Sequence, residues 1–171
     1  GLHGDRRPGD GLYGGRIPAR GSRDLMEFYI VAEDTLSASQ RFPAQGGTFC
    51  LYQIEDSAPS TKLPVYRILL THETDQNFRS QNRLSNELQD CTFVLNDTQI
   101  YYNCGIRTRG SGWTRRNHPS DQYRIRFPAD PPLRGVQREI NLDSHGRSSK
   151  QEDRLAHHLM RELGGGPTSY Q

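Results

Sequence analysis

Apolar and polar residues alternate in several short segments of the chain, and this alternation predicts β-strands. The clearest early case is residues 25–33, where Met26, Phe28, Ile30 and Ala32 would share one face of a strand. Residues 12–18 and 48–54 are two further strand candidates, separated by stretches rich in glycine and proline. Short antiparallel strands with this punctuation indicate the end of a β-sandwich module.

A second group of elements follows the polar residues 56–62, which have the composition of a linker. Residues 64–70 form an apolar strand candidate, and Thr71 is placed to cap a helix over residues 72–83. Strands are then predicted at residues 91–95 and 98–109, and again at 122–127 and 139–142. Asn96 and Asp97 tolerate the positive φ that a tight turn between the first two requires.

The last predicted element is a helix with clear signals at both ends. Ser149 and Glu152 have the spacing of a capping box, and residues 164–166 are three glycines that end the helix. Leu155, Leu159 and Leu163 belong to its apolar stripe. We therefore predict an α+β, β-rich fold, in which an antiparallel sheet with a flanking C-terminal helix follows a β-sandwich remnant.

The predicted organisation has a sandwich remnant over residues 1–55, a linker over 56–62 and a second, incomplete domain over 63–171. In that domain we expect residues 98–109 to form a central strand, paired with 91–95 and flanked by 122–127. Ile100, Tyr102, Cys104 and Ile106 would share one face, and Tyr101, Asn103, Arg107 and Arg109 the other. Tyr123, Ile125 and Phe127 would point inward.

The same hairpin gives an expectation for the cysteines. Counting outward from a turn at Asn96 and Asp97 places Cys91 opposite Tyr102, two residues short of Cys104. A disulfide needs Cα atoms within about 7 Å. We therefore expect the thiols of Cys91 and Cys104 to be free.

Composition limits the classes of partner. Only 32% of the residues are hydrophobic, and 17 glycines and 10 prolines favour short strands and turns over helical bundles. A net charge of +2 does not indicate a nucleic-acid partner, and no apolar run is long enough to span a membrane. Lysine occurs only at Lys62 and Lys150, so a phosphate would have to be bound mainly by arginine.

Six arginines and a single acid, Asp121, lie between residues 105 and 126. They are Arg107, Arg109, Arg115, Arg116, Arg124 and Arg126. One interpretation is a site for phosphate or an acidic peptide, since strand alternation places Arg107 and Arg109 on the same side. The other interpretation is a solvated outer face of a sheet. No spacing of histidine, cysteine or serine indicates a metal site or a nucleophilic group of catalytic residues.

Four segments resemble motifs of CotH-kinase-like domains, in the order that the family has them. Residues 101–110, YYNCGIRTRG, resemble the signature strand Y-x-N-x-G-hydrophobic-R-x-(K/R)-G. QYRIRF at 122–127, REINLDS at 138–144 and the helix at 153–163 followed by glycine and proline resemble the next three motifs. LPVYRILLT at 63–71 and DCTFVLND at 90–97 also resemble the version of this domain found in large bacterial surface proteins. GDGLYGGRIPA and MEFYIVAED, earlier in the chain, are similar to the end of an Ig-like or fibronectin-like module that often precedes it.

The resemblance implies a reduced, atypical protein-kinase fold, first recognised in spore coat proteins, that transfers phosphate from ATP to protein serine with a divalent metal such as Mg²⁺. It also implies a secreted or cell-surface location. Arg107, Arg109 and Arg124 would then face phosphate, and Glu152 or Asp153 would position an arginine. Two departures weaken nucleotide binding: Asp121 stands where the family has lysine, and Arg109 replaces the lysine of the signature.

The family's metal-binding and catalytic aspartates would follow Gln171, so no residue of this chain is assigned a catalytic role. We expect ATP and Mg²⁺ to serve the intact parent protein, and this chain alone to bind them weakly and to be inactive. The alternative is a non-catalytic surface module that binds protein or glycan through Trp113, Tyr101, Tyr102 and Tyr123. The expected partner is accordingly a protein substrate or another surface molecule.

Overall fold

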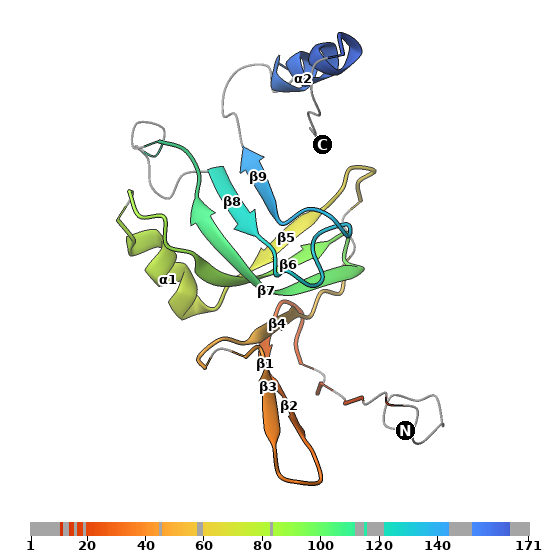
Figure 1. Cartoon of the computed structure of the whole chain (residues 1–171), viewed down its shortest axis with the longest axis vertical. Helices are drawn as coiled ribbons and strands as arrows, with labels where there is room; N and C mark the ends of the chain where they lie inside the picture. The colour runs from red at the N-terminus through yellow and green to blue at the C-terminus, as the bar shows by residue number, and fades with distance from the viewer. Residues whose placement is uncertain are drawn as a thin grey trace.

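The computed structural model describes residues 11, 14–15, 17–18, 20–44, 46–57, 60–82, 84–111, 115, 122–143 and 152–164, and the side chains of all of these except 152–154. Its strands are β1 (Leu25–Phe28), β2 (Ile30–Glu33), β3 (Ser39–Phe42), β4 (Cys50–Gln53), β5 (Tyr66–Leu69), β6 (Gln89–Leu95), β7 (Gln99–Thr108), β8 (Gln122–Arg126) and β9 (Glu139–Asp143). Its helices are α1 (His72–Ser80) and α2 (Glu152–Glu162). The fold is α+β and β-rich, as predicted (Figure 1).

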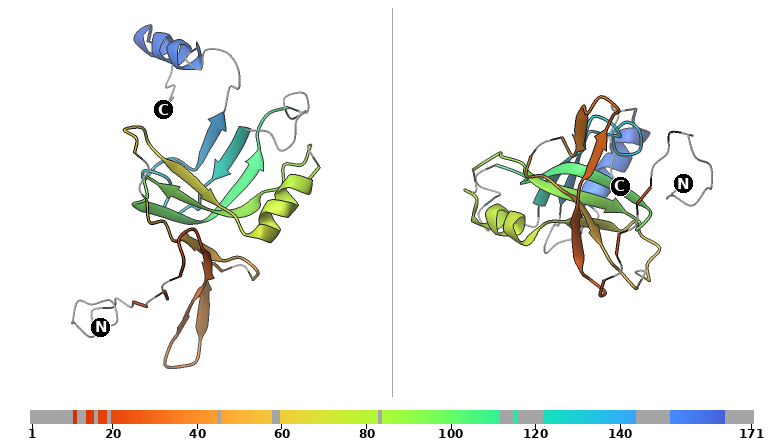
Figure 2. Two further views of the ribbon diagram at one scale, coloured as in Figure 1. Left: turned by 180° about the vertical axis from the view of Figure 1, so that it is seen from behind. Right: turned by 90° about the horizontal axis from the view of Figure 1, so that it is seen from below.

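A curled antiparallel sheet of five strands forms the body of the molecule, in the order β5-β6-β7-β8-β9 (Figures 1 and 2). Strand β7 is central and is paired with β6 on one side and β8 on the other. This arrangement confirms the predicted hairpin and its flanking strand.

The inner face of this sheet carries the main core. Phe93 and Ile125 are fully buried there, and Phe93 meets Phe127 edge to face, with ring centroids 5.1 Å apart. Helix α1 adds Phe78, which packs against Tyr123. Tyr123, Ile125 and Phe127 therefore point inward as expected, and their burial fixes which face of β8 is left for polar residues.

A β-bulge in the β6–β7 hairpin changes the predicted register. Cys91 lies opposite Cys104, and Phe93 lies opposite Tyr101, so Thr92 faces two residues of β7. An extra residue also enters at the turn, because Leu95 pairs with Gln99. The predicted placement of Cys91 opposite Tyr102 is therefore wrong by two residues, although both thiols are free in the structure.

The bulge also corrects the predicted faces of β7. One extra residue inverts the alternation of side chains beyond it, and Asn103 within the bulge has a φ of 55°. Tyr101 and Cys104 consequently both point into the inner core, whereas Ile100 packs on the outer side with Leu51 and Val94. The predicted shared face of Ile100 and Cys104 is therefore wrong.

The N-terminal strands form two small antiparallel pairs, β1–β4 and β2–β3. The predicted strand at 25–33 is divided at Tyr29, and β3 was not predicted. Strand β4 packs on the outer face of the large sheet, where the Leu51 N–H donates to Thr92 Oγ1 at 3.1 Å. Of the strand predicted at 12–18, the described residues 14–15 and 17–18 are not in a strand.

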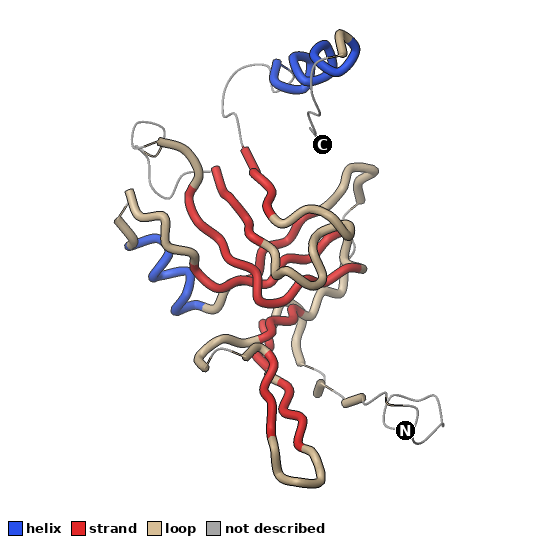
Figure 3. Tube along the Cα trace, viewed as in Figure 1, coloured by secondary structure: helices blue, strands red, loops and turns tan. Residues whose placement is uncertain are grey.

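The two helices lie in different places: α1 is beside the five-stranded sheet, and α2 is beyond the end of β9 (Figure 3). Thr71 caps α1 as predicted, because its Oγ1 accepts the Thr74 N–H at 3.0 Å. The apolar stripe of α2 is exposed at Leu155, Leu159 and Leu163, and Ser149 lies outside the described residues. Within the described part of the chain, neither helix is long and apolar enough to cross a membrane.

Candidate anion-binding face

The outer face of β7, β8 and β9 carries polar side chains in three rows across the strands. The first row contains Gly105, Arg126 and Glu139, and the second contains Arg107, Arg124 and Asn141. In the third row the Arg109 N–H donates to the Gln122 carbonyl, and Gln122 pairs with Asp143. We call the five arginines on or beside these rows the arginine face: Arg107, Arg109, Arg115, Arg124 and Arg126.

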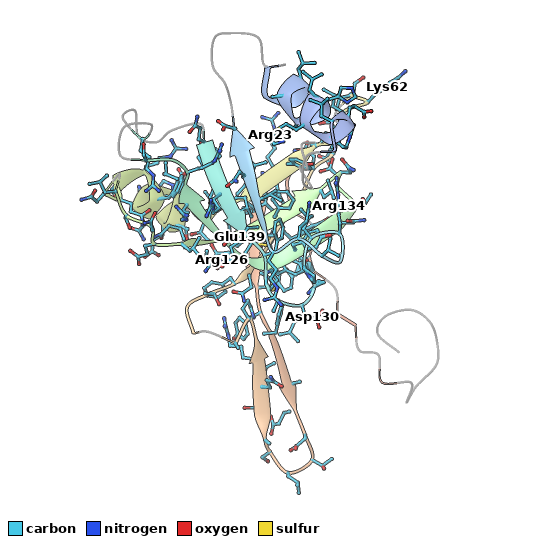
Figure 4. All side chains as sticks on the ribbon, turned by 45° about the horizontal axis from the view of Figure 1, so that its top comes forward. Arg23, Lys62, Arg126, Asp130, Arg134 and Glu139 are labelled. Carbon is cyan, nitrogen blue, oxygen red and sulfur yellow. The ribbon has the colours of Figure 1, made fainter. Side chains whose placement is uncertain are left out.

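Carboxylates of β9 neutralise the arginines of the first and third rows. Arg126 donates from Nε to Glu139 Oε1 at 2.9 Å, and its Nη2 lies 2.8 Å from the same oxygen. Figure 4 shows these two side chains beside each other on the sheet. Arg109 forms an ion pair with Asp143. Both pairs lie at a partly exposed surface, so they orient these guanidinium groups more than they stabilise the fold.

The second row differs because its β9 residue is the neutral Asn141. Arg124 donates from Nε to Asn141 Oδ1 at 3.1 Å, and the Glu139 carboxylate is farther away, 3.6 Å from Arg124 Nη1. Arg107 donates to Asn86 Oδ1 at 2.9 Å and to the Thr108 carbonyl at 3.3 Å. Neutral oxygens hold both guanidinium groups in place, and the carboxylate that reaches Arg124, that of Glu139, is shared with Arg126.

Arg115 brings a third guanidinium group to the same place. Its side chain is buried, and it donates to the Ser85 carbonyl at 2.8 Å and to Asn86 Oδ1 at 2.9 Å. One amide oxygen of Asn86 therefore accepts from both Arg107 and Arg115. Residues 84–88, which lead into β6, supply this neutral anchor.

The pKa of Arg107 is lowered from its ordinary value, first by burial and then by the positive charges of Arg124 and Arg115. Burial and like charges both disfavour a cation. An anion placed between these groups would offset the repulsion between their like charges. The arrangement can therefore bind an oxyanion through planar, charged donors on two strands, a geometry that suits phosphate or carboxylate.

The structure places Arg107, Arg109 and Arg124 on one face, and their assignment to phosphate binding stays a prediction. Glu152 and Asp153 lie in α2, but their side chains are outside the described part of the structure. The sequence did not single out Asn86 and Asn141, the neutral partners of the middle row. Asn86 is 21 residues from Arg107, and no local pattern indicates such a contact.

The alternative hypothesis, a module that binds through exposed aromatic residues, does not match the positions of its three tyrosines. Tyr101 is buried in the inner core, and its hydroxyl lies 3.1 Å from Gln99 Oε1. Tyr123 packs against Phe78, and Tyr102 meets Phe28 edge to face. These tyrosines are therefore core and interlayer residues, and they do not form one surface for a glycan. Trp113 lies outside the described residues.

The guanidinium donors of the arginine face have the charge and planar geometry that suit the phosphate part of an ATP–magnesium complex. They do not supply a metal site, since the described residues contain no group of three or more His, Cys, Asp or Glu side chains that could hold a metal ion.

Comparisons of the chain with protein-family models, with curated proteins and with solved structures find no match. The resemblance to CotH-kinase-like domains therefore stays a prediction from the four sequence motifs.

Proposed function

We propose that the arginine face binds phosphate groups and that the chain forms the phosphate-binding β-rich part of a CotH-kinase-like protein. The observation that carries this proposal is the middle row, in which Arg107 and Arg124 are oriented by Asn86 and Asn141. A solvated outer face needs no such neutral anchors. A site for an oxyanion does, because its guanidinium groups must be held in place and still carry net charge.

The carboxylates of the flanking rows pair with Arg109 and Arg126, so we expect an anion to bind at the middle row. Asp143 pairs with Arg109, Glu139 is shared between Arg126 and Arg124, and neutral oxygens accept hydrogen bonds from Arg107 and Arg115. Charge-assisted hydrogen bonds contribute about 1.5–3 kcal/mol each. Two or three such bonds would give weak but saturable binding at a surface that is partly open to solvent.

The wider role is proposed from the sequence motifs. It is phosphoryl transfer from ATP to protein serine by a secreted or cell-surface protein, in which this chain would contact the nucleotide phosphates. The signature strand supports it, because the residues that correspond to the family's R-x-(K/R) are Arg107 and Arg109, and both lie on the arginine face.

A second candidate function, a surface-binding module, is favoured by the β2–β3 hairpin. This hairpin projects from the rest of the molecule (Figure 1) and exposes Ile30, Val31 and Phe42, and Tyr29, just before β2, is exposed as well. Apolar side chains on a two-stranded ribbon with open edges are suited to contact another protein.

The phosphate proposal is tested by titrating the chain with pyrophosphate in the absence of metal, at low ionic strength. We expect the ¹⁵N–¹H signals of the Arg107 and Arg124 Nε groups to shift saturably. Arg107→Ala and Arg124→Ala should each weaken binding about tenfold or more, the equivalent of one charge-assisted hydrogen bond.

Arg79→Ala is the matched control, because it removes the same charge from the exposed Arg79–Asp75 pair of α1. It should leave the affinity almost unchanged. Equal losses from Arg79→Ala and Arg107→Ala would show that only general charge attracts pyrophosphate, and would contradict the proposed site.

A further inference from the structure

Cys91 and Cys104 lie directly opposite each other on the paired strands β6 and β7. Both side chains belong to the inner core and are almost completely buried, with 1% and 2% of their surface exposed. Because they are cross-strand partners on the same face of the sheet, their thiol groups share one small volume of the core.

Backbone geometry at this position meets the requirement for a disulfide. Directly opposed residues of an antiparallel pair have Cα atoms about 4.5–5.5 Å apart, and disulfides span Cα separations of about 4.4–6.8 Å. Burial is the main cause of the raised pKa of Cys91, and the nearby Cys104 thiol raises it further.

We infer that Cys91 and Cys104 form a disulfide bond when the chain folds in the presence of a disulfide donor. The donor is a small disulfide such as oxidised glutathione. A Cys thiolate attacks one of its sulfur atoms and releases one thiol; the second Cys thiolate then attacks the mixed disulfide and releases the other. Two protein thiols lose two protons and two electrons, and the donor is reduced to two thiols.

Burial determines when this exchange takes place. The thiolate is the attacking species, and burial raises the pKa of Cys104 to about 12, so the folded hairpin holds its thiols protonated and away from solvent. Exchange therefore belongs to the folding chain, before the core closes. After folding, the same burial protects the bond from reducing thiols.

The bond would fix the register that the sequence leaves open. The β-bulge lies immediately next to Cys91 and Cys104, and it determines that Arg107 points outward while Ile106 points inward. A slip of one residue would exchange these faces. A covalent link at Cys91 and Cys104 excludes that slip, whether or not the arginine face binds phosphate.

Cys50 provides an internal control. It is fully buried on β4, where it lies opposite Phe28 of β1, and it is not a cross-strand partner of either other cysteine. It should therefore remain a thiol under conditions that join Cys91 to Cys104.

The test starts from the reduced, denatured chain, which is refolded in an oxidising glutathione buffer, denatured again without reduction, alkylated and cleaved before aspartate. Cleavage before Asp97 places Cys91 in the peptide 90–96 and Cys104 in the peptide 97–120. Cys50 lies in the peptide 34–55. We expect 90–96 to be joined to 97–120 and Cys50 to carry the alkyl group. Linkage of Cys50 to either cysteine, or alkylation of Cys91 and Cys104 in the refolded chain, would overturn the inference.

Stability provides a second measurement that does not depend on peptide mapping. The reduced chain should have a folding equilibrium constant on the order of a hundredfold lower than that of the disulfide-bonded chain, as for other disulfides that close loops of this length. Cys91→Ala and Cys104→Ala should abolish this dependence on reductant, and Cys50→Ala should retain it. A wild-type chain whose denaturant midpoint is the same with and without reductant would contradict the bond.

Discussion

The two faces of strands β7 and β8 carry opposite kinds of residue on the same backbone. On the inner face Ile106 and Ile125 are buried and packed among aromatic rings. On the outer face their neighbours Arg107 and Arg124 are partly exposed and held by amide oxygens. One pair of strands can therefore carry a packed core on one side and a charged surface on the other, because adjacent residues of a strand point to opposite sides of the sheet.

The largest loss of stability is expected from a substitution on the inner face. Phe93→Ala should reduce the free energy of unfolding by about 3–5 kcal/mol, since it removes a fully buried ring that contacts Phe127 and Tyr101 and leaves a cavity. Chemical denaturation of the two chains measures this difference.

The control for that substitution is Phe42→Ala, on the projecting β2–β3 hairpin, where 46% of the side chain is exposed. Its cost should be well below that of Phe93→Ala. Similar losses from both substitutions would show that the hairpin belongs to the same core as the inner face.

A smaller loss of stability is expected at the one position of the outer-face rows that has no side chain. A Cβ on Gly105 would lie 3.0 Å from Leu88 Cβ, so Gly105→Ala should cost about 1–3 kcal/mol through overpacking. Gly46→Ala is the matched control, because nothing lies within 4 Å of its Cβ. Equal unfolding midpoints for the two variants would disprove the close contact between Leu88 and β7.

The smallest effect is expected at Asp90, which precedes Cys91 and lies opposite Gly105. Burial raises the pKa of this carboxyl group, although backbone N–H groups of Phe49 and Cys91 act in the opposite direction. A raised pKa in the folded state means that stability is lost as the pH rises from the unfolded pKa through the folded one. Asp90→Asn removes this loss and keeps an oxygen acceptor.

Unfolding curves of the wild type and Asp90→Asn should therefore coincide at low pH and separate toward neutral pH, where the variant is more stable. Glu33→Gln, on the exposed β2–β3 hairpin, controls for the loss of one negative charge. If Asp90→Asn is less stable than the wild type at neutral pH, the ionised carboxylate has a stabilising role that its burial does not indicate.

Local signals in the sequence were sufficient for much of the secondary structure. Thr71 marked the start of α1, and the spacing of Tyr123, Ile125 and Phe127 gave the inner face of β8. Strand β3 was missed because residues 39–42 are mostly polar, and they form a strand only by pairing with β2. Nothing in the local composition separates a bulged strand from a regular one, so the face change at Asn103 was missed as well.

The sequence by itself determined that Arg107 and Arg109 share one face and that Arg124 and Arg126 share one face, because side chains alternate along a regular stretch of strand. Only the tertiary structure decided which acid or amide each of them meets. Pairing of β8 with β9 places Asn141 beside Arg124 and Glu139 beside Arg126, and the segment before β6 brings Asn86 to Arg107. Charge compensation depends on which residues meet across strands, and that register is set by the packing of the whole sheet.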